Sequence, residues 1–235
     1  MARLTGLAGL LFLALVLAAT WPVEVWTTLQ SRPEQPVGEI TPDNRVAQSF
    51  QARLPGLSAV ELHLATYRRV NDVTLLWRLH RDRPDGPLVA AGQIAGRTVQ
   101  DNAPYRLTFP PQPDSTDRVY YLVLESPDGR PGQALTAWAS RHDYFPRGRL
   151  YLNGVPAAGD LMLALGYRTP PLAILPTLLD RLAAGRPGLW GQPALYAALL
   201  AGYALALGLL VAALLAWSQD GRSAPPSRAE KTDVD

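Results

Sequence analysis

Two long, uncharged apolar runs lie near the two ends of the chain. The first covers residues 4–21 (LTGLAGLLFLALVLAATW), and the second covers residues 194–217 (ALYAALLAGYALALGLLVAALLAW). A helix needs about 20 apolar residues to cross roughly 30 Å of hydrocarbon. The pattern therefore predicts two transmembrane helices that hold the polar middle of the chain at a membrane surface.

The N-terminal run has two interpretations, and the sequence leaves both open. A basic start, an apolar stretch and the small residues Ala18 and Ala19 are typical of a cleavable signal peptide. The length of the run, together with Trp21 and Trp26 as candidate interfacial anchors, favours a retained membrane helix over residues 1–26. In either case the middle of the chain is exported. The protein is two-pass if the run is retained and single-pass if it is cleaved.

Basic residues outside the apolar runs predict the orientation. Arg3 precedes the first run, and Arg222, Arg228 and Lys231 follow the second. Because positive charge near a membrane favours the cytoplasmic side, we expect both termini in the cytoplasm. The polar tail over 218–235 is typical of disorder. The chain has no cysteine, which excludes disulfides and suits the plasma (inner) membrane of a bacterium.

Residues 40–168 show apolar and polar positions that alternate with a period of two. The alternation is plain in VELHLATY at 60–67 and VTLLWRLH at 73–80. Further strand-like runs lie at 46–52, 87–95, 105–109, 118–125, 134–140, 148–152 and 160–168. Turn signals such as Asn153-Gly154 separate the runs. The pattern indicates a mainly β fold, an antiparallel β-sandwich or jelly roll, flanked by the two membrane helices. Trp77 shares the phase of Leu75 and Leu79 and is assigned to the core.

The segment 170–190 joins this domain to the second apolar run. Pro170 and Pro171 end the last strand-like run. Apolar residues then recur at helical spacing, at Leu175, Leu178, Leu179 and Leu182. The pattern predicts a short amphipathic helix, which lies either on the outer leaflet or on the domain itself.

Small residues recur every four positions in the second apolar run, at Ala194, Ala198, Gly202 and Ala206. Such a stripe lets another helix approach closely. We expect it to pack against the N-terminal run or against a separate membrane protein. The net charge of +2 and the lack of a basic stripe with interleaved aromatic residues argue against a nucleic-acid partner.

Several motifs follow one another in a familiar order. They are QSF at 48–50, LSAVELHLATYRRVND at 57–72, QDNAPYRLTFPP at 100–111, DS at 114–115, YYLVLESPDG at 120–129, RHDYFPRGRLYLNG at 141–154 and GDLMLALGY at 159–167. This order resembles the galactose-binding-like jelly-roll ectodomains of bacterial membrane proteins, some of them linked to glycosyltransferases or polysaccharide export. The resemblance covers residues 44–168 and implies a lectin-like or scaffolding sandwich. The many-helix catalytic part of the larger members has no counterpart in this sequence.

The sequence carries no catalytic signature of the serine-hydrolase, zinc-protease or phosphate-loop kind. His63 and His80 fall on the polar phase of strands, and the adjacent His142 and Asp143 point apart. We therefore expect no enzymatic activity and no cofactor. Calcium could use oxygen ligands from Asp101, Asn102, Asp114 or Asp160. Hydrogen bonds at turns and strand ends are the favoured roles for these residues, so no metal is predicted.

Exposed aromatic rings with polar neighbours are the best sequence signal for a binding surface. The candidate ligand-binding residues are Trp138, Arg141, Tyr144, Phe145, Arg147 and Tyr151. Burial of the same rings at a sheet edge or beneath the juxtamembrane helix is the alternative. The sequence predicts a membrane-anchored accessory protein that binds cell-envelope glycan or assists a glycan-handling membrane enzyme. The alternative function is a structural subunit of a larger membrane complex.

Overall fold

The computed structural model describes the backbone of residue 14 and of residues 16–220, which divide into two compact units. One unit is Ala19–Ile174, and the described residues outside this range belong to the other. The first unit is built from twelve strands: β1 (Val23–Gln30), β2 (Gln35–Pro36), β3 (Val46–Gln51), β4 (Leu57–Ala65), β5 (Thr74–Arg81), β6 (Leu88–Ala95), β7 (Ala103–Gln112), β8 (Val119–Glu125), β9 (Thr136–Ala139), β10 (Arg149–Leu152), β11 (Val155–Ala157) and β12 (Leu163–Thr169). A short 3-10 helix, η1 (Gly96–Thr98), follows β6.

The strands form two six-stranded antiparallel sheets. In the first, here called the β4 sheet, the order is β1-β12-β4-β9-β2, and β7 also pairs with β4. In the second, the β8 sheet, the order is β11-β10-β3-β8-β5-β6. The chain crosses between the sheets from β3 to β4 and again from β4 to β5, a pattern consistent with a jelly roll. The prediction of a mainly β, antiparallel sandwich is confirmed.

The core forms because alternate residues of each strand face the opposite sheet. In β4 the side chains of Val60, Leu62 and Leu64 are at most 1% exposed, whereas Glu61 and His63 between them are partly exposed. All nine strand-like runs of the sequence are strands here. Trp77 is 8% exposed and belongs to the core cluster, which confirms its predicted position.

The sandwich begins earlier than the sequence pattern indicated. β1 starts at Val23 and pairs with β12 along its length, so Val23 to Trp26 is strand and not the end of a membrane helix. Trp26 belongs to the outer face of the β4 sheet, where its ring contacts the Gly166 position and the Arg106 guanidinium lies 4.3 Å from the ring centroid. The short strands β2 and β11 were also not predicted.

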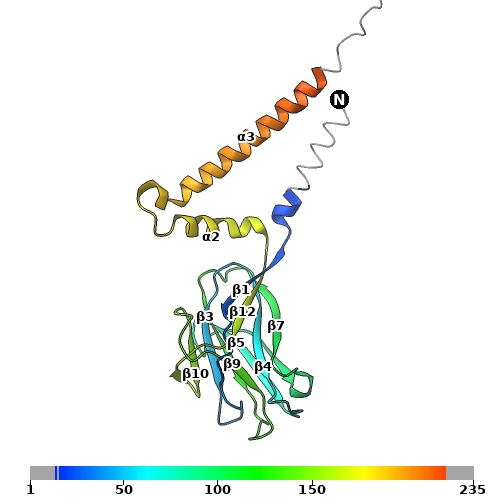
Figure 1. Cartoon of the computed structure of the whole chain (residues 1–235), viewed down its shortest axis with the longest axis vertical. Helices are drawn as coiled ribbons and strands as arrows, with labels where there is room; N and C mark the ends of the chain where they lie inside the picture. The colour runs from blue at the N-terminus through cyan, green and yellow to red at the C-terminus, as the bar shows by residue number, and fades with distance from the viewer. Residues whose placement is uncertain (1–13, 15, 221–235) are drawn as a thin grey trace, which may run out of the picture. The chain divides into compact units, whose positions relative to one another are not determined.

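The β4 sheet has two distinct ends. At one end the first residue of β1, Val23, is paired with the last residue of β12, Thr169, and Figure 1 shows these two strands side by side. The chain therefore enters and leaves the sandwich at the same place, here called the linker end. β4 runs antiparallel to β12, so its last residue, Ala65, lies at the opposite, far end.

Two α-helices follow the sandwich. β12 passes through Pro170 into α2 (Pro171–Ala183), and a 3-10 turn, η2 (Gly188–Gly191), leads to α3 (Pro193–Asp220). Within α3, Pro193–Leu214 is long and apolar enough to cross a membrane, with a mean hydropathy of 2.3. It is the one such helix among the described residues. Residues 14 and 16–20 are helical, but the rest of the N-terminal run up to residue 15, and the predicted tail beyond Asp220, lie outside the described residues.

Candidate functional site

A shallow hollow of about 280 Å³ lies at the far end of the β4 sheet. We call it the Trp138 groove, and it is lined by Pro36, Ala65, Tyr67, Arg68, Asp101, Asn102, Thr136 and Trp138. The lining comes from β2, β9, the end of β4, the loop that follows β4 and the turn that precedes β7. Positions far apart in the sequence meet here because β9 continues the sheet beside the end of β4.

Trp138 is the central aromatic side chain of the groove. Its neighbours Ala137 and Ala139 are buried in the core, so alternation puts the indole on the outer face of the sheet. The indole Nε1 donates a hydrogen bond of 2.8 Å to Asn102 Oδ1. Tyr67, which is 40% exposed, supplies a second ring. Two aromatic side chains and an amide thus share one open hollow.

The backbone around the groove adopts an uncommon conformation. Tyr67, Arg68 and Asn102 have φ values of 56°, 58° and 53°. They are three of the six non-glycine residues with positive φ in the described part of the chain. Such conformations are costly and persist where surrounding contacts enforce them, often at functional sites. The loop after β4 is therefore held in a particular shape.

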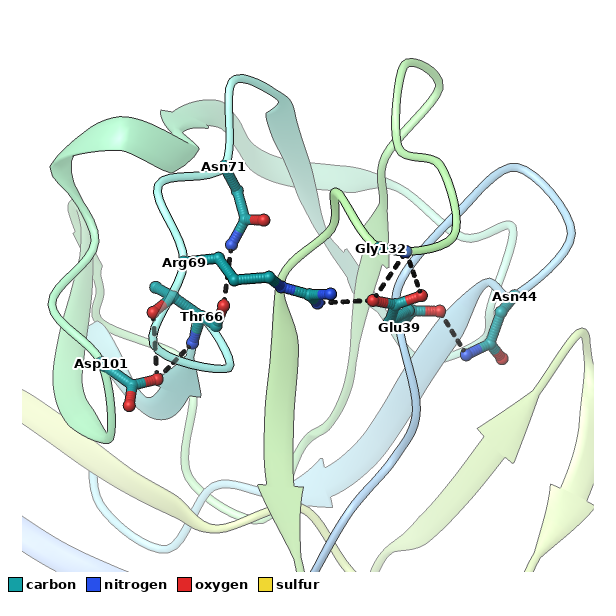
Figure 2. A network of polar contacts seen from close by, with 7 residues as sticks. All are labelled: Glu39, Asn44, Thr66, Arg69, Asn71, Asp101 and Gly132. Carbon is teal, nitrogen blue, oxygen red and sulfur yellow. Dashed lines mark hydrogen bonds and ion pairs between the residues drawn. The ribbon is translucent and has the colours of Figure 1, made fainter.

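Hydrogen bonds accepted by Asp101 and donated by Asn71 fix one side of this loop (Figure 2). Asp101 Oδ1 accepts bonds from the Thr66 N–H at 2.7 Å and from the Thr66 hydroxyl at 3.0 Å. The buried Asn71 side-chain amide donates to the Thr66 carbonyl at 3.1 Å. The Thr66 N–H also lowers the pKa of Asp101 below its ordinary value. The carboxylate form of Asp101 thus stabilises the start of the loop that carries Tyr67 and Arg68.

An ion pair fixes the other side of the loop. Figure 2 shows Arg69 reaching toward Glu39, with its Nη2 2.5 Å from Glu39 Oε1. The same carboxylate accepts hydrogen bonds of 3.0 and 3.1 Å from the Gly132 N–H. Burial raises the pKa of Glu39, but the bonds from Arg69 and Gly132 outweigh it, and the net shift is downward. The groove wall is therefore anchored on both sides before any ligand binds.

Arg141 and Tyr144, two of the predicted binding residues, meet at a different place. Glu34 joins them: its carboxylate accepts a 2.8 Å bond from the Arg141 N–H and a 3.2 Å bond from the Tyr144 hydroxyl. The Arg32 guanidinium lies 4.6 Å from the Tyr144 ring centroid. The Arg141 N–H is the main cause of a lowered pKa at Glu34. These groups thus bind one another across two loops, the one between β1 and β2 and the one after β9.

The remaining predicted binding residues do not join either group. Phe145 is 4% exposed and packs in the core, so its ring does not offer a stacking face; for this residue the structure shows the burial that the sequence left open as the alternative. Arg147 donates to Gln51 at 3.3 Å. Tyr151 lies on the β8 sheet, with its ring 6.4 Å from that of Tyr121. Of the six residues, Trp138 alone lines the groove.

The residues considered as calcium ligands have other partners. Asp114 pairs with Arg81 at 3.0 Å and with Arg118 at 3.2 Å. Asp160 is 1% exposed and accepts hydrogen bonds from Gln48, Tyr144 and Phe145. Asp101 and Asn102 belong to the groove contacts described above. Within the described residues, no group of three or more acidic or histidine side chains is arranged to hold a metal ion.

The residues of the predicted helix-packing stripe, Ala194, Ala198, Gly202 and Ala206, all lie within α3. Apart from the local helix backbone, no atom of the described residues lies within 4 Å of a Cβ built at Gly202. Gly202 thus leaves room for the approach of another helix, and helix packing through the stripe stays a prediction.

Comparison with known proteins adds little. No protein-family model matches the chain, and no curated protein matches it. Among solved structures, the infectious bursal disease virus VP2 subviral particle has 18% identity and a TM-score of 0.29, covering 65% of this chain and 43% of that one. The Gt strain structure of the same virus has 15% identity and a TM-score of 0.30, covering 62% and 36%. Likenesses this weak carry no argument about function or fold. The sandwich is assigned from the pairing of its own strands. The resemblance to galactose-binding-like ectodomains remains a sequence-based prediction.

Proposed function

We propose that this chain is a membrane-anchored, non-catalytic protein whose extracytoplasmic sandwich binds cell-envelope glycan at the Trp138 groove. The observation that carries the proposal is that two aromatic side chains, those of Trp138 and Tyr67, line one open hollow. An aromatic face stacks on the apolar face of a pyranose ring, and nearby polar groups orient the hydroxyls. Arg68, Asp101 and Asn102 supply such groups at the edge of the groove.

The position of the groove within the sandwich supports the same proposal. The chain enters and leaves at the linker end, where Val23 pairs with Thr169. The groove lies around Ala65, at the far end of the β4 sheet. A sandwich tethered through its linker end would keep the far end free for a long polymer. The contacts of Asp101 and Glu39 lower the ordering cost of binding, because the loop is already held in place.

Binding should be tested with the full-length protein in lipid nanodiscs, against immobilised N-acetylglucosamine oligomers, a galactan and a mannan. Trp138→Ala should abolish retention on whichever glycan is bound. Tyr151→Ala is the matched control, since it removes a partly exposed ring from the other sheet. If no glycan retains the wild type, or if both variants bind like it, the proposal is wrong.

We propose further that the N-terminal run and α3 both cross the plasma membrane, with the two termini in the cytoplasm. The pairing of Val23 with Thr169 supports this topology, because neighbouring antiparallel strands lie only about 5 Å apart. Both links could thus enter one bilayer side by side. Reporter fusions to each terminus and to the Asn153-Gly154 turn would test it. An N-terminus missing from the mature protein would establish cleavage and a single-pass protein instead.

The alternative function is a structural subunit of a larger membrane complex. The small-residue stripe on α3 favours it, because Gly202 leaves room for close approach of another helix. Gly202→Leu should release a co-purifying partner from detergent-solubilised membranes. Gly208→Leu is the matched control, since Gly208 is equally open but lies on a different face of the helix. Purification of the wild type without a stoichiometric partner would contradict this alternative.

A further inference from the structure

The segment between the sandwich and α3 exposes an unusual number of large apolar side chains. In α2, Leu172, Leu178 and Leu182 are 56%, 46% and 47% exposed. In the turn that follows, Leu189 and Trp190 are 69% and 57% exposed. Large apolar side chains exposed together along one segment are typical of contact with a partner or a membrane.

The exposed leucines of α2 share one face of the helix. At 3.6 residues per turn, Leu172, Leu175, Leu178, Leu179 and Leu182 fall on one stripe. The charged residues Asp180 and Arg181 lie off this stripe, toward the other side of the helix. Ile174, in the first turn, packs against the sandwich core. Beyond it, Leu178 and Leu182 are exposed, and Leu175 and Leu179 are partly exposed. The helix is therefore two-sided, with an apolar face that is at least partly exposed along its length.

The turn after α2 is tied to the start of α3. Gly185 and Gly188 adopt positive φ values of 74° and 59°, which turn the chain sharply. Arg186 Nη1 donates a 2.9 Å bond to the Tyr196 hydroxyl, which in turn donates a 2.8 Å bond to the Trp190 carbonyl. Residues from Leu175 through α3 belong to one compact unit. The position of this turn relative to a bilayer therefore follows from the position of α3 in that bilayer.

The start of that helix fixes the level at which the turn lies in a bilayer. The candidate span begins at Pro193, and Trp190 and Tyr196 flank this position. Tryptophan and tyrosine are the residues enriched at the boundary between headgroups and hydrocarbon. A helix joined to this boundary by a hydrogen-bonded turn, with leucines on one face and charges on the other, has the character of an interfacial helix.

We infer that α2 and the η2 turn lie in the outer-leaflet interface, with the leucine stripe and Trp190 immersed at the boundary between headgroups and acyl chains. The occupant of this surface is the lipid bilayer and not the sandwich. Pro170 alone separates β12 from α2, so the interfacial segment would begin one residue after the last strand of the sandwich.

The absence of native cysteine allows a direct test with single labels. Leu178→Cys and Leu182→Cys would each carry an environment-sensitive fluorophore in the full-length protein. The protein would be reconstituted in vesicles of phosphatidylethanolamine and phosphatidylglycerol. Asp180→Cys, on the polar face, and Val70→Cys, 79% exposed in the sandwich, are the controls. Leu189→Cys repeats the test in the turn without altering α2.

Labels at Leu178, Leu182 and Leu189 should be quenched severalfold more by spin-labelled phospholipids than the labels at Asp180 and Val70. Aqueous iodide should show the reverse order. Iodide quenching at the leucine positions as strong as at Val70 would show that the helix is in water. Resistance to both quenchers would show that protein covers it. Either result overturns the inference, and neither depends on whether the groove binds glycan.

Discussion

Replacement of Asp160 should release the loop over residues 141–147 and destabilise the sandwich. The side chain is 1% exposed. One carboxylate oxygen accepts a 3.0 Å bond from the Gln48 amide, and the other accepts bonds of 2.8 and 2.9 Å from the N–H groups of Tyr144 and Phe145. Burial raises the pKa of Asp160, and the bonds from Phe145 and Gln48 oppose that shift. Burial thus disfavours the charged carboxylate, and the hydrogen bonds from its three donors stabilise it.

The size of the effect follows from the donors left without an acceptor. Asp160→Ala strands two buried N–H groups, that of Phe145 and one of the two on the Gln48 amide, whose nitrogen keeps its 3.1 Å bond to the Ser49 carbonyl; the Tyr144 N–H is only partly buried. A buried donor without a partner costs about 1–3 kcal/mol, so the loss is roughly 2–6 kcal/mol. Asp160→Asn keeps one oxygen and should lose about half as much. Against a typical stability of about 5–15 kcal/mol, either change is large.

Urea unfolding of the full-length protein in detergent micelles, followed by near-ultraviolet circular dichroism, measures this loss. Tryptic cleavage at Arg141 and Arg147 reports release of the loop itself. Asp143→Asn is the control, because this neighbouring carboxylate is exposed and should shift stability by less than about 0.5 kcal/mol. An Asp160→Ala protein that unfolds at the same urea concentration as this control would refute the reasoning.

Three further outcomes are expected in the same urea assay. Gly166→Ala should cost about 1–3 kcal/mol, because the new Cβ would lie 2.8 Å from the Trp26 ring; unchanged stability would mean that the ring moves freely. Tyr120→Phe should be neutral or stabilising, since the buried hydroxyl has no hydrogen-bond partner in the described residues, and a clear loss would reveal a hidden partner. The lowered pKa of Asp101 adds stability that is present above its ordinary value of 3.8 and lost as the pH falls through the folded-state value. Asp101→Asn should therefore flatten the acid limb of stability against pH, and an unaltered limb would contradict this.

The sequence pattern was sufficient for the nine main strands because each carries its own alternation of apolar and polar positions. It failed for β2 and β11, which span only Gln35–Pro36 and Val155–Ala157. Elements this short have no period to detect and exist only through pairing with β9 and β10. β1 does alternate, but it directly follows an apolar run, and its first residues fall within the membrane helix predicted over residues 1–26.

Little of the candidate site could be predicted from the sequence, because the residues that form it meet only in the tertiary structure. Trp138 was predicted from its phase within one strand, a local property. Its association with Tyr67 and Asn102 depends on the register between β4 and β9 and on three residues with positive φ, which no short pattern specifies. The sequence did contain a cue, because Tyr67 and Asn102 fall in the motifs LATYRRVND and QDNAPY, and an Asp-Asn pair is typical of a turn.

The sequence by itself determined the alternating strands and the apolar length of α3, because both depend on the spacing of residues close together in the chain. The burial of Phe145, the insertion of β1 and the assembly of the Trp138 groove were decided only by the folded sheets. In each case the deciding contact joins residues far apart in the sequence, as when Asp160 binds the Phe145 N–H or Val23 pairs with Thr169. Such contacts have no signature in local spacing, since their free energy appears only when the two sheets close on a shared core.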